Sequence, residues 1–336
     1  LIISHPNFID GLKPLVAARQ AQMMVKVVNV EDVYAQFSGG VFDAQAIKDY
    51  IHYALDNMGV QYVLLVGGDT NNPRDYSGLG SISFIPSLYA RTTEDIYFAP
   101  VDPLYTDVDG NNVPDAVIGR LPVRSVDQLN WMVDKTLLYD NRSERQTAAF
   151  AADVSYEDDS DSFVPVGWTV QKAYVGLDGL DTARKTLIDS MNDGPALTSF
   201  VGHSDTDVWT FDPLFSTWDA AALTNYGKPM VITQWGCFNT YYVGEAYVSL
   251  GDNFLLRPNI GAAAVTGATT ITDANSEREL GKLLMPKLTQ PGMSIGQAMQ
   301  EAKVELAANH HNRGMVDVLL GWTILGDPTL VVQPQS

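Results

Sequence analysis

The sequence is poor in cysteine and in positive charge, and it has no long apolar run. Only one of its 336 residues is cysteine, Cys237, so neither an internal disulfide nor a zinc site built on paired cysteines can form. Lysine and arginine number 21 against 40 aspartate and glutamate, which gives a net charge of −19. This charge disfavours nucleic acid and anionic lipid as partners. No run of 18 apolar residues occurs, so no membrane-spanning helix is expected.

Apolar residues make up 46% of the chain and charged residues 18%, a balance that excludes an intrinsically disordered polymer. The first six residues lack the basic region of a signal peptide and are typical of a strand. We therefore expect that a leader or propeptide has been removed. The acidic composition also fits an extracellular protein.

Short apolar runs alternate with helical patterns along the chain, which predicts an α/β fold with a mainly parallel sheet. Residues 62–68 form one such run, apolar on both faces. Before it, Asp43 is a predicted cap and Gly59 a predicted end of an amphipathic helix. The polar stretch 140–146 is the most plausible seam, so we predict two adjoining α/β subdomains, 1–143 and 144–336, with helices flanking their sheets.

Two predicted strands of the second half end in reactive residues. The strand at 196–201 leads through a glycine to His203, and the strand at 229–235 leads through a glycine to Cys237. Functional groups collect at the carboxyl ends of strands in such sheets, and a histidine can activate a thiol. The alternative is that Cys237 is a small buried core residue.

The order of several short motifs resembles that of the gingipain-type cysteine peptidases, which have a caspase-like fold. The resemblance spans nearly the whole chain, and the motifs that carry it begin at Tyr62, Asp115, Val201, Trp235, Ser249, Gly261 and Ile324. It implies a caspase-like α/β fold and a cysteine-type endopeptidase acting on protein or peptide substrates.

The resemblance also implies roles for single residues. Cys237 would attack the scissile carbonyl, and His203 would protonate the leaving amine. The backbone N–H groups of Ser204 and Cys237 would form the oxyanion hole, with Ser204 standing where the family usually has glycine. Asp115 matches the position expected for an acid that orients the histidine.

The loop from Asp107 to Asp115 carries oxygen ligands at alternating positions, which predicts a structural Ca²⁺ site. The predicted ligands are Asp107, Asp109, Asn111 and Asp115. The loop is not an EF-hand, because its twelfth position is Ile118 and not glutamate. The alternative is a plain turn rich in Asp and Asn.

The sequence thus predicts a secreted or cell-surface cysteine endopeptidase. A gingipain-like sortase or transpeptidase is one alternative, since an amine can resolve an acyl-enzyme in place of water. A non-catalytic binding or assembly module that keeps the fold is another. The acidic surface favours Lys or Arg before the scissile bond only weakly, and the oligomeric state is not predicted.

Overall fold

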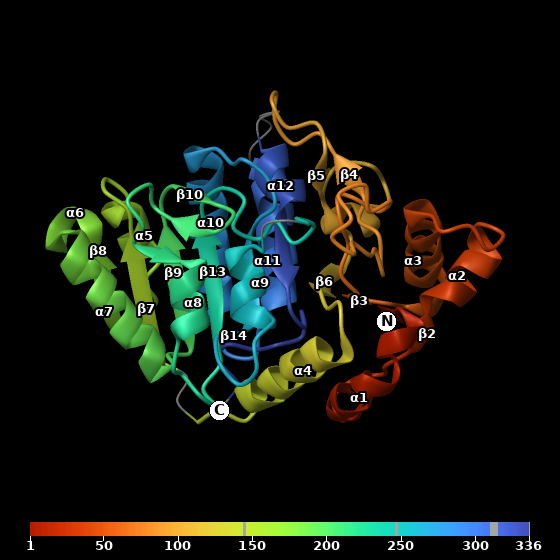
Figure 1. Ribbon diagram of the computed structural model, residues 1–336, viewed down its shortest axis with the longest axis horizontal. Helices are drawn as coiled ribbons and strands as arrows, with labels where there is room; N and C mark the ends of the chain where they lie inside the picture. The colour runs from red at the N-terminus through yellow and green to blue at the C-terminus, as the bar shows by residue number, and fades with distance from the viewer. Residues whose placement is uncertain (144–145, 246–247, 310–314, 336) are drawn as a thin grey trace.

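A computed structural model describes residues 1–143, 146–245, 248–309 and 315–335. Its centre is a ten-stranded sheet with helices on both faces (Figure 1). In spatial order the strands are β2 (Val27–Asn29), β1 (Ile2–Ser4), β3 (Tyr62–Val66), β6 (Val117–Leu121), β15 (Trp322–Leu325), β14 (Ala262–Ala268), β13 (Met230–Trp235), β9 (Leu197–Val201), β7 (Thr147–Ala152) and β8 (Thr169–Tyr174).

Neighbouring strands of this sheet pair in parallel, except for β14 and β15, which are antiparallel. The two halves of the sheet meet at a single residue pair, Leu325 of β15 and Arg120 of β6. The predicted mainly parallel α/β fold is therefore confirmed. The predicted subdomain boundary at 143/144 touches residues 144–145, which lie outside the described residues, and it stays a prediction.

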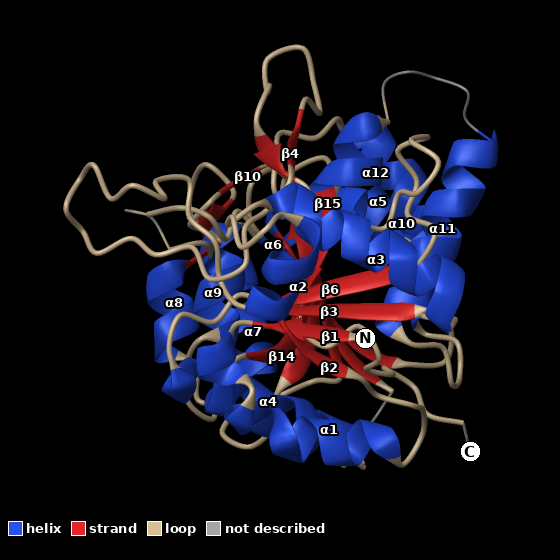
Figure 2. Ribbon diagram, turned by 90° about the vertical axis from the view of Figure 1, so that its right-hand side faces the viewer, coloured by secondary structure: helices blue, strands red, loops and turns tan. Residues whose placement is uncertain are grey.

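Helices cover both faces of the sheet (Figure 2). One face carries α1 (Lys13–Gln20), α4 (Val126–Asp140), α7 (Leu180–Asp193), α8 (Thr217–Ala222) and α9 (Leu250–Leu255). The other face carries α2 (Val30–Phe37), α3 (Ala44–Met58), α10 (Ala274–Leu288), α11 (Ile295–Asn309) and α12 (Val316–Gly321).

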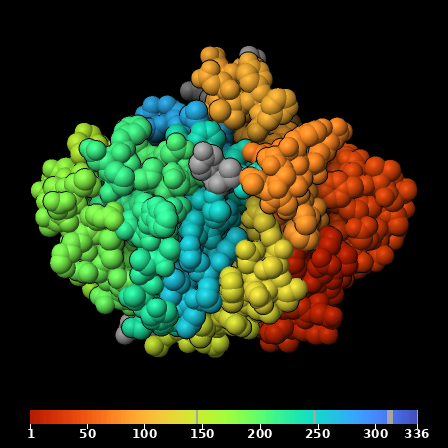
Figure 3. All heavy atoms as spheres, viewed as in Figure 1, coloured from red at the N-terminus to blue at the C-terminus, as the bar shows by residue number. Residues whose placement is uncertain are grey.

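Smaller elements lie at the ends of the sheet. They are the short helices α5 (Glu157–Ser162) and α6 (Val175–Asp178), the 3₁₀ turns η1 (Pro6–Phe8), η2 (Asp10–Leu12) and η3 (Asp102–Tyr105), the hairpin of β4 (Tyr89–Ala90) and β5 (Ala99–Pro100), and the three-stranded sheet of β10 (Ser204–Asp205), β11 (Val208–Trp209) and β12 (Phe215–Ser216). In Figure 3 the yellow segment that includes α4 lies between the orange and red N-terminal elements and the cyan elements of the second half.

Local sequence signals explain where the helices begin and end. The Asp43 side chain accepts a hydrogen bond from the backbone N–H of Gln45 at the start of α3, and Gly59 ends that helix in the left-handed region at φ +64°. Asp273 caps α10 in the same way, accepting from the backbone N–H groups of Asn275 and Ser276. These caps satisfy N–H groups that have no partner within the helix.

Candidate active site

The carboxyl ends of β7, β9 and β13 lie side by side, because these three parallel strands are neighbours in the sheet. Asp153 follows β7 directly, His203 follows β9 after Gly202, and Cys237 follows β13 after Gly236. A carboxylate, an imidazole and a thiol are therefore presented at one edge of the sheet, in strand order. The sequence expectation that His203 and Cys237 each follow a strand of the second half through a glycine agrees with this arrangement.

Close packing explains the glycine before each of these two residues. A Cβ at Gly202 would lie 2.3 Å from the Cβ of Asp153, and a Cβ at Gly236 would lie 2.3 Å from the Oγ of Ser204. Gly202 also has a φ of +149°, which side chains rarely allow. A side chain at either glycine would push the strand ends apart.

The carboxylate that contacts His203 belongs to Asp153. Oδ2 of Asp153 lies 2.9 Å from Nδ1 of His203, and it also accepts a hydrogen bond from the His203 backbone N–H at 3.3 Å. The Asp153 side chain is 13% exposed, whereas that of His203 is 49% exposed. Because Asp153 occupies Nδ1, Nε2 is the ring nitrogen left to face a substrate.

The structure corrects the expectation that Asp115 orients His203. Asp115 precedes β6, and three strands separate β6 from β9 in the sheet, which puts it well beyond hydrogen-bonding distance at roughly 4.8 Å per strand. Its carboxylate instead accepts a hydrogen bond from the backbone N–H of Val108 at 2.8 Å. Sequence reasoning missed Asp153, although it directly follows the apolar run at 148–152.

The Cys237 thiol contacts Thr272, which follows β14. Sγ lies 3.5 Å from the backbone nitrogen of Thr272, 3.8 Å from its carbonyl oxygen and 3.7 Å from its hydroxyl. Within the described residues no hydrogen bond joins Sγ to His203. Catalytic hydrogen bonds in free enzymes are often long or poorly aligned, and they tighten only when substrate is bound.

Burial raises the pKa of the Cys237 thiol. The hydrogen bonds from Thr272 oppose this shift, and the negative charges of Glu277 and Asp205 reinforce it. The thiol therefore rests in its neutral form at neutral pH. A base or an approaching imidazolium is needed to produce the nucleophilic thiolate.

Glu277 is a second acid that sequence reasoning missed. It lies in the first turn of α10, is buried, and accepts a hydrogen bond from the Thr272 hydroxyl. Burial raises its pKa to about 8, with smaller contributions that include Asp317 and Asp273. Nothing in the sequence distinguishes Glu277 from an ordinary surface acid at a helix start.

The predicted oxyanion donor Ser204 lies in β10, and its side chain links the two reactive loops. Its hydroxyl donates to the Cys237 carbonyl at 2.8 Å and accepts from Nδ2 of Asn239 at 3.1 Å. Ser204 is not among the residues with positive φ, so serine replaces the family's glycine without backbone strain. Phe238, directly after Cys237, does have a positive φ of 56°, which costs about 1 kcal/mol for a side-chain-bearing residue.

Two aromatic rings contact His203. Tyr156 meets the imidazole edge-on at 5.3 Å between ring centroids, and Phe211 lies at 5.0 Å and is 84% exposed. An exposed phenylalanine at this position leaves apolar surface beside the histidine for a ligand to cover.

The structure brings together three of the four predicted calcium ligands. One carboxylate oxygen from each of Asp107, Asp109 and Asp115 lies within 4.8 Å of the other two. Asn111 differs, because its Oδ1 accepts from the backbone N–H of Val113 and its Nδ2 donates to Asp109. Three carboxylates this close repel one another, and a hard divalent cation would relieve that repulsion.

Comparisons with known proteins agree with the expected family. The model of peptidase family C25 matches residues 1–333. No curated protein matches the chain significantly. No helix within the described residues has the length and apolar character needed to cross a membrane.

Several solved structures, gingipains among them, share the fold. The complex of the pro- and mature domains of RgpB from Porphyromonas gingivalis aligns with a TM-score of 0.77 and 19% identity, over 98% of this chain and 78% of that one. The Arg-specific cysteine proteinase gingipain R aligns with a TM-score of 0.77 and 18% identity, over 98% and 77%. Latent PorU from Porphyromonas gingivalis aligns with a TM-score of 0.54 and 16% identity, over 98% and 29%. The family model covers nearly the whole chain, and the chain therefore belongs to peptidase family C25, as its resemblance to the gingipain-type cysteine peptidases predicted.

Proposed function

We propose that the chain is a secreted cysteine endopeptidase that uses Cys237 as its nucleophile and His203 as its acid and base. The observation that carries this proposal is the adjacency of the β7, β9 and β13 ends, which bear Asp153, His203 and Cys237 in that order. Membership of a peptidase family supports a protein or peptide as the substrate.

In the proposed reaction the Cys237 thiol loses its proton to Nε2 of His203, and Sγ attacks the scissile carbonyl carbon. The C–N bond then breaks, and the imidazolium gives its proton to the leaving amine. Water, deprotonated by the same nitrogen, hydrolyses the thioester and frees Cys237. Asp153 holds the Nδ1 proton throughout and stabilises the imidazolium.

The negative oxygen of the tetrahedral intermediate would be stabilised by the backbone N–H groups of Cys237 and Ser204. The short link from the Ser204 hydroxyl to the Cys237 carbonyl supports this pairing, because it fixes the two backbones relative to each other.

We further propose that Ca²⁺ binds the loop that leads to β6, with Asp107, Asp109 and Asp115 as ligands. The convergence of their carboxylates supports this site. Asn111 would join only if its side chain turned away from Val113. The ion would act structurally, because the loop carries none of the residues at the β7, β9 and β13 ends.

The test of the proposed function is Cys237→Ala. Peptide cleavage should disappear while the melting temperature stays within a few degrees of the wild type, since only the nucleophile is removed. A chloromethyl ketone should label the wild-type chain once, at Cys237, and leave the variant unlabelled. Full activity of the variant would disprove the proposed chemistry.

The same assay separates hydrolysis from transfer. An added amine such as hydroxylamine or a glycine peptide should divert only a minor share of product in an endopeptidase. If most product carries the amine, the enzyme is a transpeptidase. Recovery of the chain from the culture medium or cell surface of its host would test the proposed localisation.

A further inference from the structure

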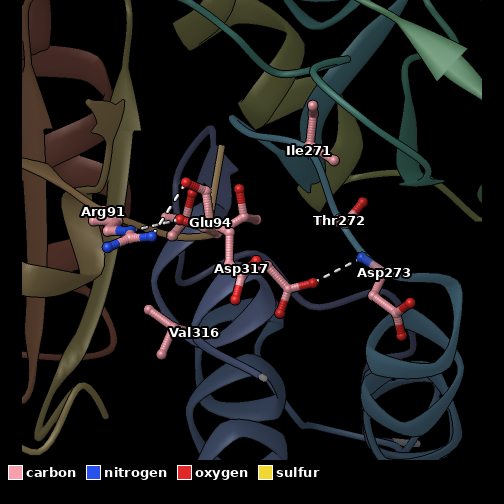
Figure 4. A pocket seen from close by; sticks show the side chains of 9 residues that line it. Arg91, Glu94, Ile271, Thr272, Asp273, Val316 and Asp317 are labelled. Atoms are coloured by element: carbon pink, nitrogen blue, oxygen red, sulfur yellow. Dashed lines mark hydrogen bonds between the residues drawn. The ribbon is translucent and has the colours of Figure 1, made fainter. Parts of the chain in front are cut away.

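A cavity of about 870 Å³ opens between the two halves of the chain (Figure 4). One wall is the loop Arg91–Glu94 of the first half, and the others are the segment Ile271–Asp273 and the start of α12. Thr272 forms part of the lining and also contacts Sγ of Cys237. The volume lies in the range of binding sites for small ligands or single side chains, roughly 300–1,000 Å³.

The cavity contains a buried carboxylate that is only half satisfied. Asp317 is 2% exposed and lines the cavity. Its Oδ2 accepts a hydrogen bond from the backbone N–H of Asp273 at 2.8 Å, whereas its Oδ1 has no hydrogen-bond partner within the described residues. Burial raises the pKa of Asp317 to about 6, so the group is mainly anionic at neutral pH. A buried anion with a free oxygen favours a ligand that donates to it.

The charged groups among the described residues of the lining have a negative sum. Glu94 and Asp273 add two carboxylates, and Arg91 is the one cation among the described residues of the lining. The Arg91 guanidinium donates to the backbone oxygens of Thr93 and Glu94 and lies 4.5 Å from the centre of the Tyr97 ring. Arg91 is thus held by its own loop, and no ion pair to Asp317 is present in the described part of the chain.

The position of the cavity relative to His203 decides which part of a substrate can reach it. His203, Cys237 and Thr272 follow β9, β13 and β14, and Asp317 lies in the first turn of α12, the helix that leads into β15. His203 must protonate the leaving amine, so the acyl part of the peptide extends toward β14 and β15. The strand before Cys237, β13, and the strand after α12, β15, are two strand spacings apart, roughly 10 Å, which corresponds to about three residues of extended peptide.

We propose that this cavity is a subsite for a positively charged substrate side chain, lysine or arginine, located two to four residues before the scissile bond, with Asp317 as its acceptor. The inference rests on the proposed peptidase function. It adds to that function a recognition element that is separate from the residue at the scissile bond itself.

The first experiment uses a set of tetrapeptide substrates that the wild-type enzyme cleaves. Their second, third and fourth residues before the scissile bond are in turn lysine, norleucine or glutamate. Norleucine matches the lysine stem without the charge. At one of these positions kcat/KM should be roughly tenfold higher for lysine than for norleucine, as expected for a hydrogen bond to a charged group, and lowest for glutamate.

Asp317→Asn keeps the acceptor for the Asp273 N–H but removes the charge. It should abolish the lysine preference, so that the lysine and norleucine peptides are cleaved with similar kcat/KM. Asp252→Asn is the matched control, because Asp252 is also 2% exposed with an unpartnered Oδ1 and a pKa raised to about 6 by burial, yet it does not line the cavity. The control should retain the preference. If Asp317→Asn does not fold, Val316→Lys is the second variant. It places an amine in the cavity wall and should also abolish the lysine preference.

A binding experiment separates this inference from the proposed function. Fluorescein-labelled lysine and norleucine peptides are titrated into the Cys237→Ala variant and followed by anisotropy, which needs no turnover. Tighter binding of the lysine peptide that is lost with Asp317→Asn supports the subsite even if no peptide is cleaved. Equal binding and equal cleavage of the two peptides at all three positions, or a preference that survives Asp317→Asn, would overturn it.

Discussion

At the scale of single residues, the site depends on which acid meets the imidazole. Asp153 and Asp115 are both aspartates next to a strand, one after β7 and one before β6. Only Asp153 lies on a strand adjacent to β9, and only its carboxylate contacts His203. Asp115 belongs to the cluster with Asp107 and Asp109. Substitution of the two residues should therefore affect turnover differently.

Asp153→Asn should lower kcat by about 10³- to 10⁴-fold, because an amide cannot stabilise the imidazolium and favours the wrong tautomer. Substrate KM should change little, since Asp153 lies behind the ring. Asp115→Asn is the matched control and should leave kcat near normal when calcium is saturating. A large loss with Asp115→Asn, together with near-normal turnover of Asp153→Asn, would return the orienting role to Asp115.

Glu277 gives the protein a pH-dependent stability. Its pKa is about 8 in the folded protein, against an ordinary 4.5, so between these values the folded state binds a proton that the unfolded state has lost. As the pH rises through that window, this group should therefore lower the free energy of unfolding by about 1.4 kcal/mol per pH unit.

Glu277→Gln should remove that slope. The variant should be more stable than the wild type near pH 8, and the difference should shrink toward pH 5. Urea unfolding at pH 5, 6, 7 and 8 measures this. Asp205→Asn is the control, since Asp205 also raises the thiol pKa but is exposed. Parallel stability curves for Glu277→Gln and wild type would show that Glu277 ionises normally.

At the scale of elements, the loop between η3 and β6 is held mainly by its own acidic side chains. Asp107 accepts hydrogen bonds from the backbone N–H groups of Gly110, Asn111 and Asn112. Asp109 and Asp115 are exposed at the same point. These turns shape the loop without a metal, yet they leave three negative charges together.

Calcium at millimolar concentration should raise the melting temperature of the wild type, because an ion that binds only the folded state stabilises it by mass action. Asp109→Asn should reduce this calcium-dependent increase in melting temperature, since the substitution removes one ligand charge. Scanning calorimetry with calcium, with magnesium and with chelator tests this. A melting temperature that is the same in all three would exclude the calcium site.

At the scale of the whole molecule, one apolar core runs through both halves. Leu64 and Val66 of β3 belong to the same buried cluster as Phe200 of β9 and Ile232 of β13. Lys135 of α4 reinforces this contact, because its buried ammonium donates to the carbonyls of three second-half residues, Phe254, Leu255 and Ile260. The halves are therefore expected to unfold together.

Calorimetry should show a single transition for the full chain. Lys135→Met should lower the free energy of unfolding by about 3 kcal/mol, because it leaves buried carbonyls without a donor. Lys303→Met is the matched control, since Lys303 donates to Leu319 and Trp322 within the second half. If Lys135→Met splits the transition and Lys303→Met does not, α4 is what couples the halves. Two transitions in the wild type would support independent subdomains.

The sequence by itself determined the class of fold, the strands that carry His203 and Cys237, and the family. These follow from local signals, namely apolar runs, helix caps such as Asp43, and a glycine at each strand exit, all of which act over a few neighbouring residues. The same local signals were enough to find the acidic loop at 107–115.

The tertiary structure alone decided that Asp153 meets His203, that Thr272 and Glu277 lie beside the thiol, and that Asp317 faces a cavity next to it. Each of these contacts joins residues from different strands or helices. Their proximity depends on the order of strands in the sheet, which apolar periodicity does not encode. An aspartate after a strand has the same local pattern whether its strand lies next to β9 or four places away, and only the packed sheet distinguishes the two.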